Sequence, residues 1–383
     1  QMAGRLNADV RLDVADGRQR AAVKATAERL QAMGRSVGAA NIDATVVDPT
    51  GIPLVNGTAD LRAVDLSGVL IETASLRANG NAAGTDLTLD AVAQGTTVRT
   101  AGRLEPREGG ARLRLDRLTA ARGNLNAAMT APATFTLANG AVTIDRFALS
   151  SGGGTATVSG TAGETLDLSV DLRALPLSLA NLAAPSANLS GTLAGTARIG
   201  GTPAAPTGNY DLRIARLSNP DLAGSGAGPF DITANGTLAG GRANLRATIS
   251  GQNIQNFTVN GSVPLGAGEL DIALRGAINL AIGNPLLATT GARVTGIANV
   301  DATIRGTAAA PRAGGTVRVS GGRFDDAVNG VALDQIEAVL TGTDRSVTLT
   351  SLRARTTNGG SVTGRGNVAL DPAAFYPGRV DLD

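Results

Sequence analysis

Short runs in which polar and apolar residues alternate one by one recur along the whole chain, and they constrain its fold more than any other feature. A period of two places every second side chain on one face of a β-strand, so each run is typical of a strand with one buried face. Clusters of Gly, Asn and Ser between the runs have the composition of tight turns between antiparallel neighbours. The sequence therefore predicts a long antiparallel meander. The clearest runs are residues 9–14, 86–89, 112–115, 166–172, 211–214, 269–274 and 316–319.

Residues 314–330, GGTVRVSGGRFDDAVNG, show how one such module is built. Its Gly pairs let the strand bend and approach its neighbours, and its Asn-Gly pair is expected to turn the chain at low strain. Alternation puts Val317 and Val319 on the inner face and Arg318 on the outer face. We interpret Asp325 and Asp326 as a solvated turn in preference to a metal or acid/base pair.

One segment is compatible with two kinds of secondary structure. In residues 21–30, AAVKATAERL, Val23, Ala27 and Leu30 share a helix face, whereas Val23, Ala25 and Ala27 share a strand face. Of the two, we expect a strand.

An internal repeat organises the second half of the chain. Residues 191–214 and 296–319 align without a gap, 105 positions apart, and both are preceded by Leu/Ala-rich segments that break the alternation. A weaker sequence similarity relates residues 141–160 to residues 346–366. Such a period is typical of stacked supersecondary units. We expect short helical segments near residues 176–185 and 277–290, and one continuous elongated body with an N-terminal part at 1–174 and repeats at 175–279 and 280–383.

The composition excludes most enzyme classes. The 383 residues contain no His, no Cys and no Trp, so the common proton shuttle, thiolate nucleophile and soft metal ligands are missing. Lys24 is the one lysine and has no phosphate-binding motif around it, and no nucleophile-elbow spacing occurs. We therefore expect no enzyme activity, no catalytic residues, no metal site and no cofactor.

We expect no nucleic acid as a partner. The net charge is +2, the arginines are scattered among aspartates, and aromatic residues make up 2% of the chain, so neither a basic stripe nor stacking rings are available. No run approaches 18 apolar residues, and the first residues lack the features of a signal peptide. We expect the sequence to be a fragment of a longer protein.

The order of motifs in the second half resembles the TamB family, the inner-membrane-anchored periplasmic subunit of the translocation and assembly module, within the AsmA-like/TamB superfamily. The resemblance is carried by LPLSLANLAAP, SGTLAG and GGTPAAP, by the GT…P…GG.F.D…NGV.L…I run from Gly306 to Ile336, and by TTNGGSVTGRGNVALDP. These motifs span residues 175–372 and are specific mainly in their order.

This resemblance implies a curved sheet folded into an open, β-taco-like trough with an aliphatic lining. It implies a role in phospholipid movement between the inner and outer membranes and in outer-membrane protein and autotransporter assembly in a Gram-negative periplasm. The partners would be phospholipid acyl chains and an outer-membrane assembly barrel of the TamA type, bound through a region outside this chain. The full-length protein would be anchored by an N-terminal helix that is not present here.

The spacing of the alternating runs also predicts a sheet of many strands. At about 12 residues per strand and turn, the chain would form roughly 30 strands, and an open sheet of that length must cover its apolar face. The expected lipid-groove lining is aliphatic and carries no charge pattern for a head group. It comprises Leu166, Leu168, Val170, Ile199, Leu212, Ile214, Leu270, Ile272, Leu274, Ile304, Val317, Val319, Ile336, Leu340, Val347 and Leu349.

Two other interpretations fit the same alternation. A structural or adhesive β-solenoid surface protein without a lipid ligand would also be rich in Gly, Asn and Thr, but it would show coil-length repeats near 20 residues. A polysaccharide-acting β-helix that uses only carboxylates would be the one compatible enzyme. An aliphatic strand face is also what an ordinary core presents.

Overall fold

The computed structural model describes residues 3–15, 18–32, 35–49, 53–66, 69–224, 226–369 and 377–383. The run TTNGGSVTGRGNVALDP, which carries part of the family resemblance, ends in residues 370–372, and these three residues lie outside the described ranges. The chain divides into two compact units, one of residues 1–187 with 200–203 and one of residues 188–199 with 204–383.

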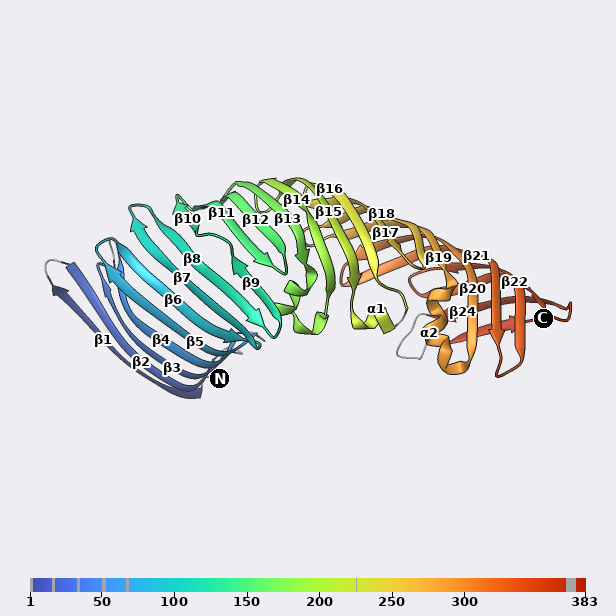
Figure 1. The fold of residues 1–383 in the computed structure, drawn as a ribbon, viewed down its shortest axis with the longest axis horizontal. Helices are drawn as coiled ribbons and strands as arrows, with labels where there is room; N and C mark the ends of the chain where they lie inside the picture. Colours follow the sequence, from blue (N-terminus) through green and yellow to red (C-terminus); the bar gives the residue numbers. More distant parts are fainter. Residues whose placement is uncertain are drawn as a thin grey trace. The chain divides into compact units, whose positions relative to one another are not determined.

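Unit 1 is an antiparallel meander in which hairpins connect strands that follow one another in the sequence (Figure 1). Two short 3₁₀ helices, η1 (Leu177–Leu182) and η2 (Pro185–Ala187), follow its last strand. The strands are β1 (Ala3–Ala15), β2 (Arg18–Ala32), β3 (Arg35–Val47), β4 (Leu54–Leu66), β5 (Val69–Asn81), β6 (Gly84–Ala93), β7 (Thr96–Arg107), β8 (Gly110–Arg122), β9 (Leu125–Met129), β10 (Ala133–Ala138), β11 (Ala141–Ser151), β12 (Gly154–Ala162) and β13 (Leu166–Pro176).

Unit 2 is also an antiparallel meander, and its longest strands are β20 and β21, with 16 and 17 residues. Its helical pieces are α1 (Pro220–Gly224), η3 (Leu280–Gly283), α2 (Asn284–Leu287) and η4 (Ala288–Thr290). Its strands are β14 (Ser190–Gly201), β15 (Pro206–Ser218), β16 (Phe230–Ala239), β17 (Arg242–Gly251), β18 (Ile254–Pro264), β19 (Glu269–Asn279), β20 (Ala292–Thr307), β21 (Ala310–Asp326), β22 (Val331–Gly342), β23 (Ser346–Thr356), β24 (Ser361–Ala369) and β25 (Gly378–Leu382).

The all-β, antiparallel fold predicted from the alternation is confirmed, and all 25 described strands belong to one hydrogen-bonded sheet. The strands number 25 instead of about 30 because several are long, up to 17 residues in β21. The segment at residues 21–30 lies within β2, as expected. Every register given for the described strands is antiparallel, from β1–β2 to β24–β25, so the parallel β-helix interpretations are wrong in fold.

Both predicted helical segments are present, and the sequence repeat is a structural repeat. η1 and η2 precede the strand pair β14 and β15 in the sequence, just as η3, α2 and η4 precede the hairpin of β20 and β21. Gly191 and Gly296, which are equivalent in the repeat, both have φ in the positive range, at 114° and 125°. The equivalent Gly201 and Gly306 both have φ of 80°. The repeat therefore preserves backbone conformation as well as strand order.

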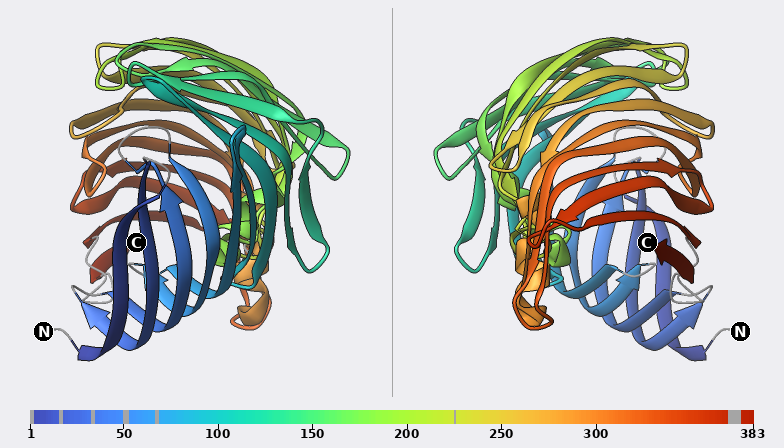
Figure 2. Two further views of the ribbon diagram at one scale, coloured as in Figure 1. Left: turned by 90° about the vertical axis from the view of Figure 1, so that its left-hand side faces the viewer. Right: turned by 90° about the vertical axis from the view of Figure 1, so that its right-hand side faces the viewer.

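The strands bow along their length, so the sheet of each unit is curved (Figure 2). Glycines in the middle of strands make this bending possible. Gly261 in β18 has φ of 149°, and a Cβ at this position would lie 2.8 Å from the Cα of Ile272 on the neighbouring strand β19. Only glycine allows the two backbones to approach so closely at this φ.

One strand of the meander is broken. β9 and β10 both pair with β8 on one side and β11 on the other, so together they fill a single strand position. The break falls at residues 130–132, which end in Pro132. Proline has no backbone N–H to donate to a neighbouring strand, which explains the interruption.

Large side chains are not enclosed in either unit. Eleven hydrophobic residues of the described chain are buried, and ten of these are alanine, with Val64 the exception. The accessible surface is 22598 Å², whereas two separate compact bodies of half this mass would together expose roughly 17,000 Å². The chain thus exposes about a third more surface than a pair of closed domains, as expected for single-layer sheets.

Candidate functional site: the aliphatic face

All sixteen residues of the predicted lining are half-buried, neither enclosed nor fully exposed. Because side chains alternate between the two faces of a strand, the register between strands decides which of these residues share a face. In both units the register joins them to further apolar residues, and the cross-strand rows that result form what we name the aliphatic face.

In unit 1, the predicted residues of β13 continue a row that crosses several strands. Leu166, Leu168 and Val170 lie opposite Ala162, Gly160 and Val158 of β12. From Leu168 the row passes through Gly160 of β12 and Ile144 of β11 to Phe135 of β10, Leu113 of β8 and Leu104 of β7.

In unit 2, the structure brings several predicted residues directly together. Ile272 lies opposite Ile304. Leu340 lies between Val317 on one side and Leu349 on the other. These direct neighbours form the densest part of the aliphatic face.

The other predicted residues of unit 2 lie opposite small or apolar residues on the same face. Leu270 and Leu274 lie opposite Gly306 and Ala302, and Leu212 and Ile214 lie opposite Ala234 and Ile232. Val319 lies between Ala298 and Ala338, and Ile336 lies opposite Gly322. Val347 lies between Gly342 and Val368. Ile199 has its Cα 3.2 Å from the position that a Cβ on Gly208 would occupy, which makes it a neighbour of that residue.

Sequence reasoning missed the continuation of this face through the earlier strands. Leu87 and Leu89 on β6 lie opposite Ala78 and Leu76 of β5, and Leu113 on β8 lies opposite Leu104 of β7. Their alternating runs at 86–89 and 112–115 were visible in the sequence. Phe135 and Phe147 add a ring pair with centroids 5.9 Å apart. Phe135 lies in the alternating run ATFTL at residues 133–137, whereas Phe147 does not lie in such a run.

On β19–β23 the positions of the aliphatic face carry no charged side chain. The charges lie on the opposite face, where Arg275 pairs with Asp301 at 3.3 Å and Arg305 with Asp271 at 3.7 Å. The aliphatic face can therefore contact alkyl groups but offers no fixed charge to a head group.

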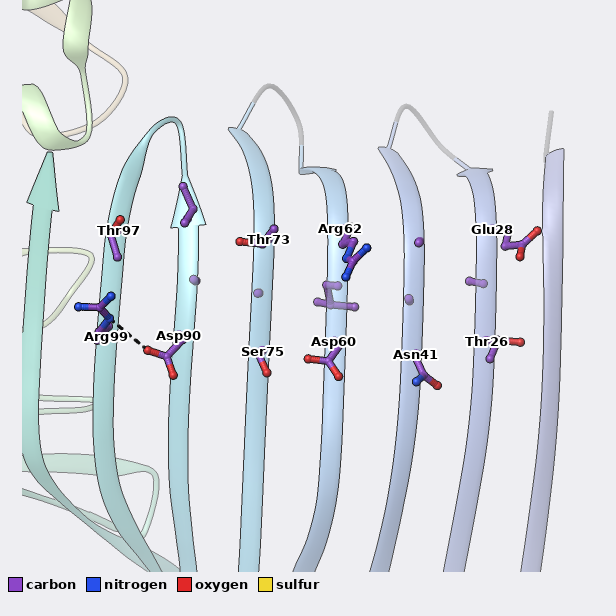
Figure 3. A pocket seen from close by; sticks show the side chains of 17 residues that line it. Thr26, Glu28, Asn41, Asp60, Arg62, Thr73, Ser75, Asp90, Thr97 and Arg99 are labelled. Carbon is purple, nitrogen blue, oxygen red and sulfur yellow. Dashed lines mark ion pairs between the residues drawn. The ribbon is translucent and has the colours of Figure 1, made fainter. Parts of the chain in front are cut away.

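The opposite face of unit 1 holds a polar hollow of about 850 Å³ over β2–β7. Figure 3 shows side chains from neighbouring strands around it, with the ion pair between Arg99 and Asp90, at 3.4 Å, drawn as a dashed line. Asp60 and Asp90 both flank Ser75 in the register. No residue of the predicted lining contributes to this hollow, so it is a feature separate from the predicted lining.

The acidic pair that the sequence places in a turn forms the last two residues of β21, and the turn itself follows at residues 327–330. Asp325 pairs with Arg323 at 2.6 Å, and Arg323 also contacts Asp334 at 2.9 Å. The hydrogen bond from Arg323 lowers the pKa of Asp325. Hydrogen bonds from the side chain and backbone of Asn329, and from the Val328 N–H, lower the pKa of Asp326. Each carboxylate thus has a local structural role.

The part of the chain that the structure describes contains no group of three or more acidic side chains placed to hold a metal ion. Within the same residues, no helix has the length and apolar character that crossing a membrane requires.

Comparison with known proteins gives no relative for this chain. No family model, no curated protein and no solved structure matches it.

Proposed function

We propose that this chain is the β-trough segment of a TamB-like periplasmic protein, and that its aliphatic face carries phospholipid acyl chains between the inner and outer membranes. One observation carries the proposal. The predicted lining is half-buried throughout, and no leucine, isoleucine or phenylalanine of the described residues is fully enclosed. An extended apolar surface must be covered, and a bound acyl chain is a cover that can leave and be replaced.

The energetics favour a continuous apolar path. A phospholipid with about 30 methylenes would cost roughly 25 kcal/mol to expose to water, at about 0.8 kcal/mol per methylene. Rows of aliphatic side chains that run across successive strands offer contact to an alkyl chain at every step. Because the face lacks fixed charges, the head group would remain in water and selectivity among head groups would be weak.

The wider context is part of the same proposal. The order of the motifs supports a periplasmic location, an anchor in the inner membrane elsewhere in the full-length protein, and a TamA-type partner in the outer membrane. Support of outer-membrane protein and autotransporter assembly would follow from lipid supply or from direct contact with the substrate. The absence of His and Cys from the sequence favours carriage over catalysis.

A photo-crosslinking residue placed on each face tests the proposal. Val317 lies between Val300 and Leu340 on the aliphatic face, and Arg318 lies between Asn299 and Val339 on the opposite face. We expect the probe at Val317 to capture phospholipid in cells, while the same probe at Arg318 captures little. Equal capture at both positions, or at neither, would remove the support for a lipid path in β20–β22.

A charge substitution separates an open face from a closed core. Val317→Asp places a carboxylate on the apolar surface, where an unpaired charge costs several kcal/mol if water cannot reach it. On an open face the variant should keep its circular dichroism spectrum and lose lipid capture at a probe in the neighbouring strand. Arg318→Asp, one position away, should change neither. Unfolding of Val317→Asp alone would instead indicate an enclosed core.

A further inference from the structure

Two charged side chains of unit 1 carry polar atoms that are buried and unpaired. Among the described residues, only Glu72 Oε2 and Arg122 Nη1 are buried side-chain polar atoms without a hydrogen-bond partner. Glu72 lies on β5, and Arg122 is the last residue of β8. A buried polar atom without a partner destabilises the folded chain, and a bound ion or molecule is one explanation for its presence.

Both groups lie against the turn at residues 94–95, which joins β6 to β7. The Gly95 N–H donates to Glu72 Oε1 at 3.0 Å. On Arg122, the Nε, Cζ and Nη2 atoms lie 3.9–4.0 Å from the position that a Cβ on Gly95 would occupy. Although the two groups have opposite charges and this common neighbour, Glu72 Oε2 and Arg122 Nη1 do not bond to each other. The turn therefore has an unpaired acceptor and an unpaired donor beside it.

The turn lies at the rim of the aliphatic face. Every second residue of β7 from Thr96 to Leu104 lies on one side of the sheet, and Leu104 belongs to the apolar row that crosses unit 1. Arg122 follows two residues after Ala120, which lies opposite Val98 on that side. Arg122 is thus on the same side of the sheet as the apolar rows.

Helix η1 packs on this rim. It contacts β8 and β9, and the buried Thr96 hydroxyl donates to the Leu182 carbonyl at 2.9 Å. Glu72 and Arg122 are both half-buried, so a ligand can reach the two groups from the rim when their terminal bonds rotate. From Thr96 the face extends about 26 Å along β7, at roughly 3.3 Å per residue. One acyl chain spans about 15 Å, half of a bilayer core of roughly 30 Å, so it fits within this length.

The two unpaired atoms define the chemistry of a ligand. A guanidinium N–H pairs well with an oxyanion, and phosphate is one that arginine recognises in proteins. A carboxylate oxygen accepts a hydrogen from an ammonium group. A molecule that carries a phosphate and an ammonium group close together satisfies both atoms at once, whereas a water molecule would neutralise neither charge.

We propose that the turn at Gly95, with Arg122 and Glu72 beside it, is a head-group site for a phospholipid of the phosphatidylethanolamine type. Arg122 binds the phosphate, Glu72 binds the primary ammonium group, and the acyl chains lie on the aliphatic face. This inference rests on the proposed function. It adds one point of head-group recognition in unit 1 to a face that carries no charged side chain on β19–β23.

Lipid competition on the 383-residue chain tests the site. The chain is incubated with vesicles of equal parts phosphatidylethanolamine, phosphatidylcholine and phosphatidylglycerol with the same acyl chains, and the lipid it retains is quantified by mass spectrometry. Phosphatidylcholine has no N–H to donate to Glu72, and phosphatidylglycerol has no ammonium group. We expect about tenfold enrichment of phosphatidylethanolamine over each of the others, the ratio that one hydrogen bond to a charged group supplies.

Two substitutions that remove a single charge should abolish this enrichment. Glu72→Gln keeps an acceptor for the Gly95 N–H but no longer attracts an ammonium group, and Arg122→Gln no longer fixes the phosphate. The total amount of retained lipid should stay the same, because the aliphatic face is intact. Arg117→Gln and Glu108→Gln are the matched controls, since both residues are exposed, and they should leave the enrichment unchanged.

Urea unfolding of the lipid-free chain separates a binding role from a structural one. Each substitution removes an unpaired charge, so neither Glu72→Gln nor Arg122→Gln should unfold at a lower urea concentration than the parent chain. Earlier unfolding of both variants would show that the two groups stabilise the fold, and it would refute the head-group site.

The lipid measurements distinguish this inference from the proposed function. Equal retention of the three lipids, or an enrichment that survives both substitutions, would refute the head-group site and leave the lipid path standing. A parent chain that retains no lipid would refute the proposed function and the head-group site with it. Displacement of the lipid by soluble phosphoethanolamine at equal concentration would show that the site binds a free phosphate ester, and it would also overturn the assignment to a lipid.

Discussion

Substitution of Gly261 by alanine tests whether close backbone approach controls the bending of the sheet. Gly261 lies between Leu245 of β17 and Ile272 of β19 on the aliphatic face. A Cβ there would lie 2.8 Å from Ile272 Cα and would overlap the carbonyl oxygen of Asp271. Both obstacles are backbone atoms, so no change of rotamer relieves the overlap and the strands must move apart.

The expected cost has two parts. An L-residue held at φ of 149° costs about 1–3 kcal/mol in backbone strain. Forcing an additional methyl group into a well-packed position adds about 1–3 kcal/mol. Gly261→Ala should therefore lose about 2–6 kcal/mol, against a total of about 5–15 kcal/mol for a typical domain.

Urea unfolding followed by circular dichroism measures the loss, and hydrogen exchange locates it. Exchange should accelerate in β17–β19 and stay unchanged in β1–β5. Gly266→Ala is the matched control, because a Cβ at Gly266 meets no atom within 4 Å, so the change should be neutral or slightly stabilising. If both variants unfold at the parent urea concentration, the argument that glycine permits the bend is wrong.

Three further predictions concern local interactions. Asn284→Ala removes the acceptor that holds the Val294 N–H at 2.7 Å and should cost about 1–3 kcal/mol in urea unfolding, whereas Asn284→Asp keeps an acceptor and should cost less. The lowered pKa of Asp326 means that its contribution to the free energy of unfolding is present above about pH 4 and is lost as pH falls through the folded-state pKa. Asp326→Asn should therefore make the free energy of unfolding depend less on pH in acid. An unchanged pH dependence in this variant would contradict the role given to Asp326. Ile272→Ala should cost about 1–2 kcal/mol, below the 2–5 kcal/mol or so of an enclosed core, because the side chain is only half-buried; a larger loss by thermal unfolding would argue for a closed interior.

The sequence was most informative where side-chain period and turn chemistry agree. Alternation across residues 269–274 and 316–319 located β19 and β21 and assigned Ile272 and Val317 to one face. The Leu/Ala-rich segments stood out because they break that alternation. These features are local, so a single chain reveals them without any tertiary information.

Features that depend on neighbouring strands were beyond the sequence. Ala63, Arg29 and Gln335 have positive φ inside strands, and each lies where the pairing register is irregular or skips a residue. Helix α1 also went unpredicted, because a five-residue segment has too few turns to show a helical period. The polar hollow over β2–β7 arises from side chains on six strands and has no signature in any one of them.

The order of pairing within each unit has a consequence for how such a chain acquires its length. Nearly every strand contacts only the strand before it and the strand after it in the sequence, apart from the broken position between β8 and β11. Low sequence separation between partners favours rapid folding that can begin at several hairpins and spread. Insertion of a hairpin between two neighbouring strands breaks only the one pairing between them and replaces it by pairings of each strand with the new hairpin. Selection could therefore change the length of such a sheet one hairpin at a time.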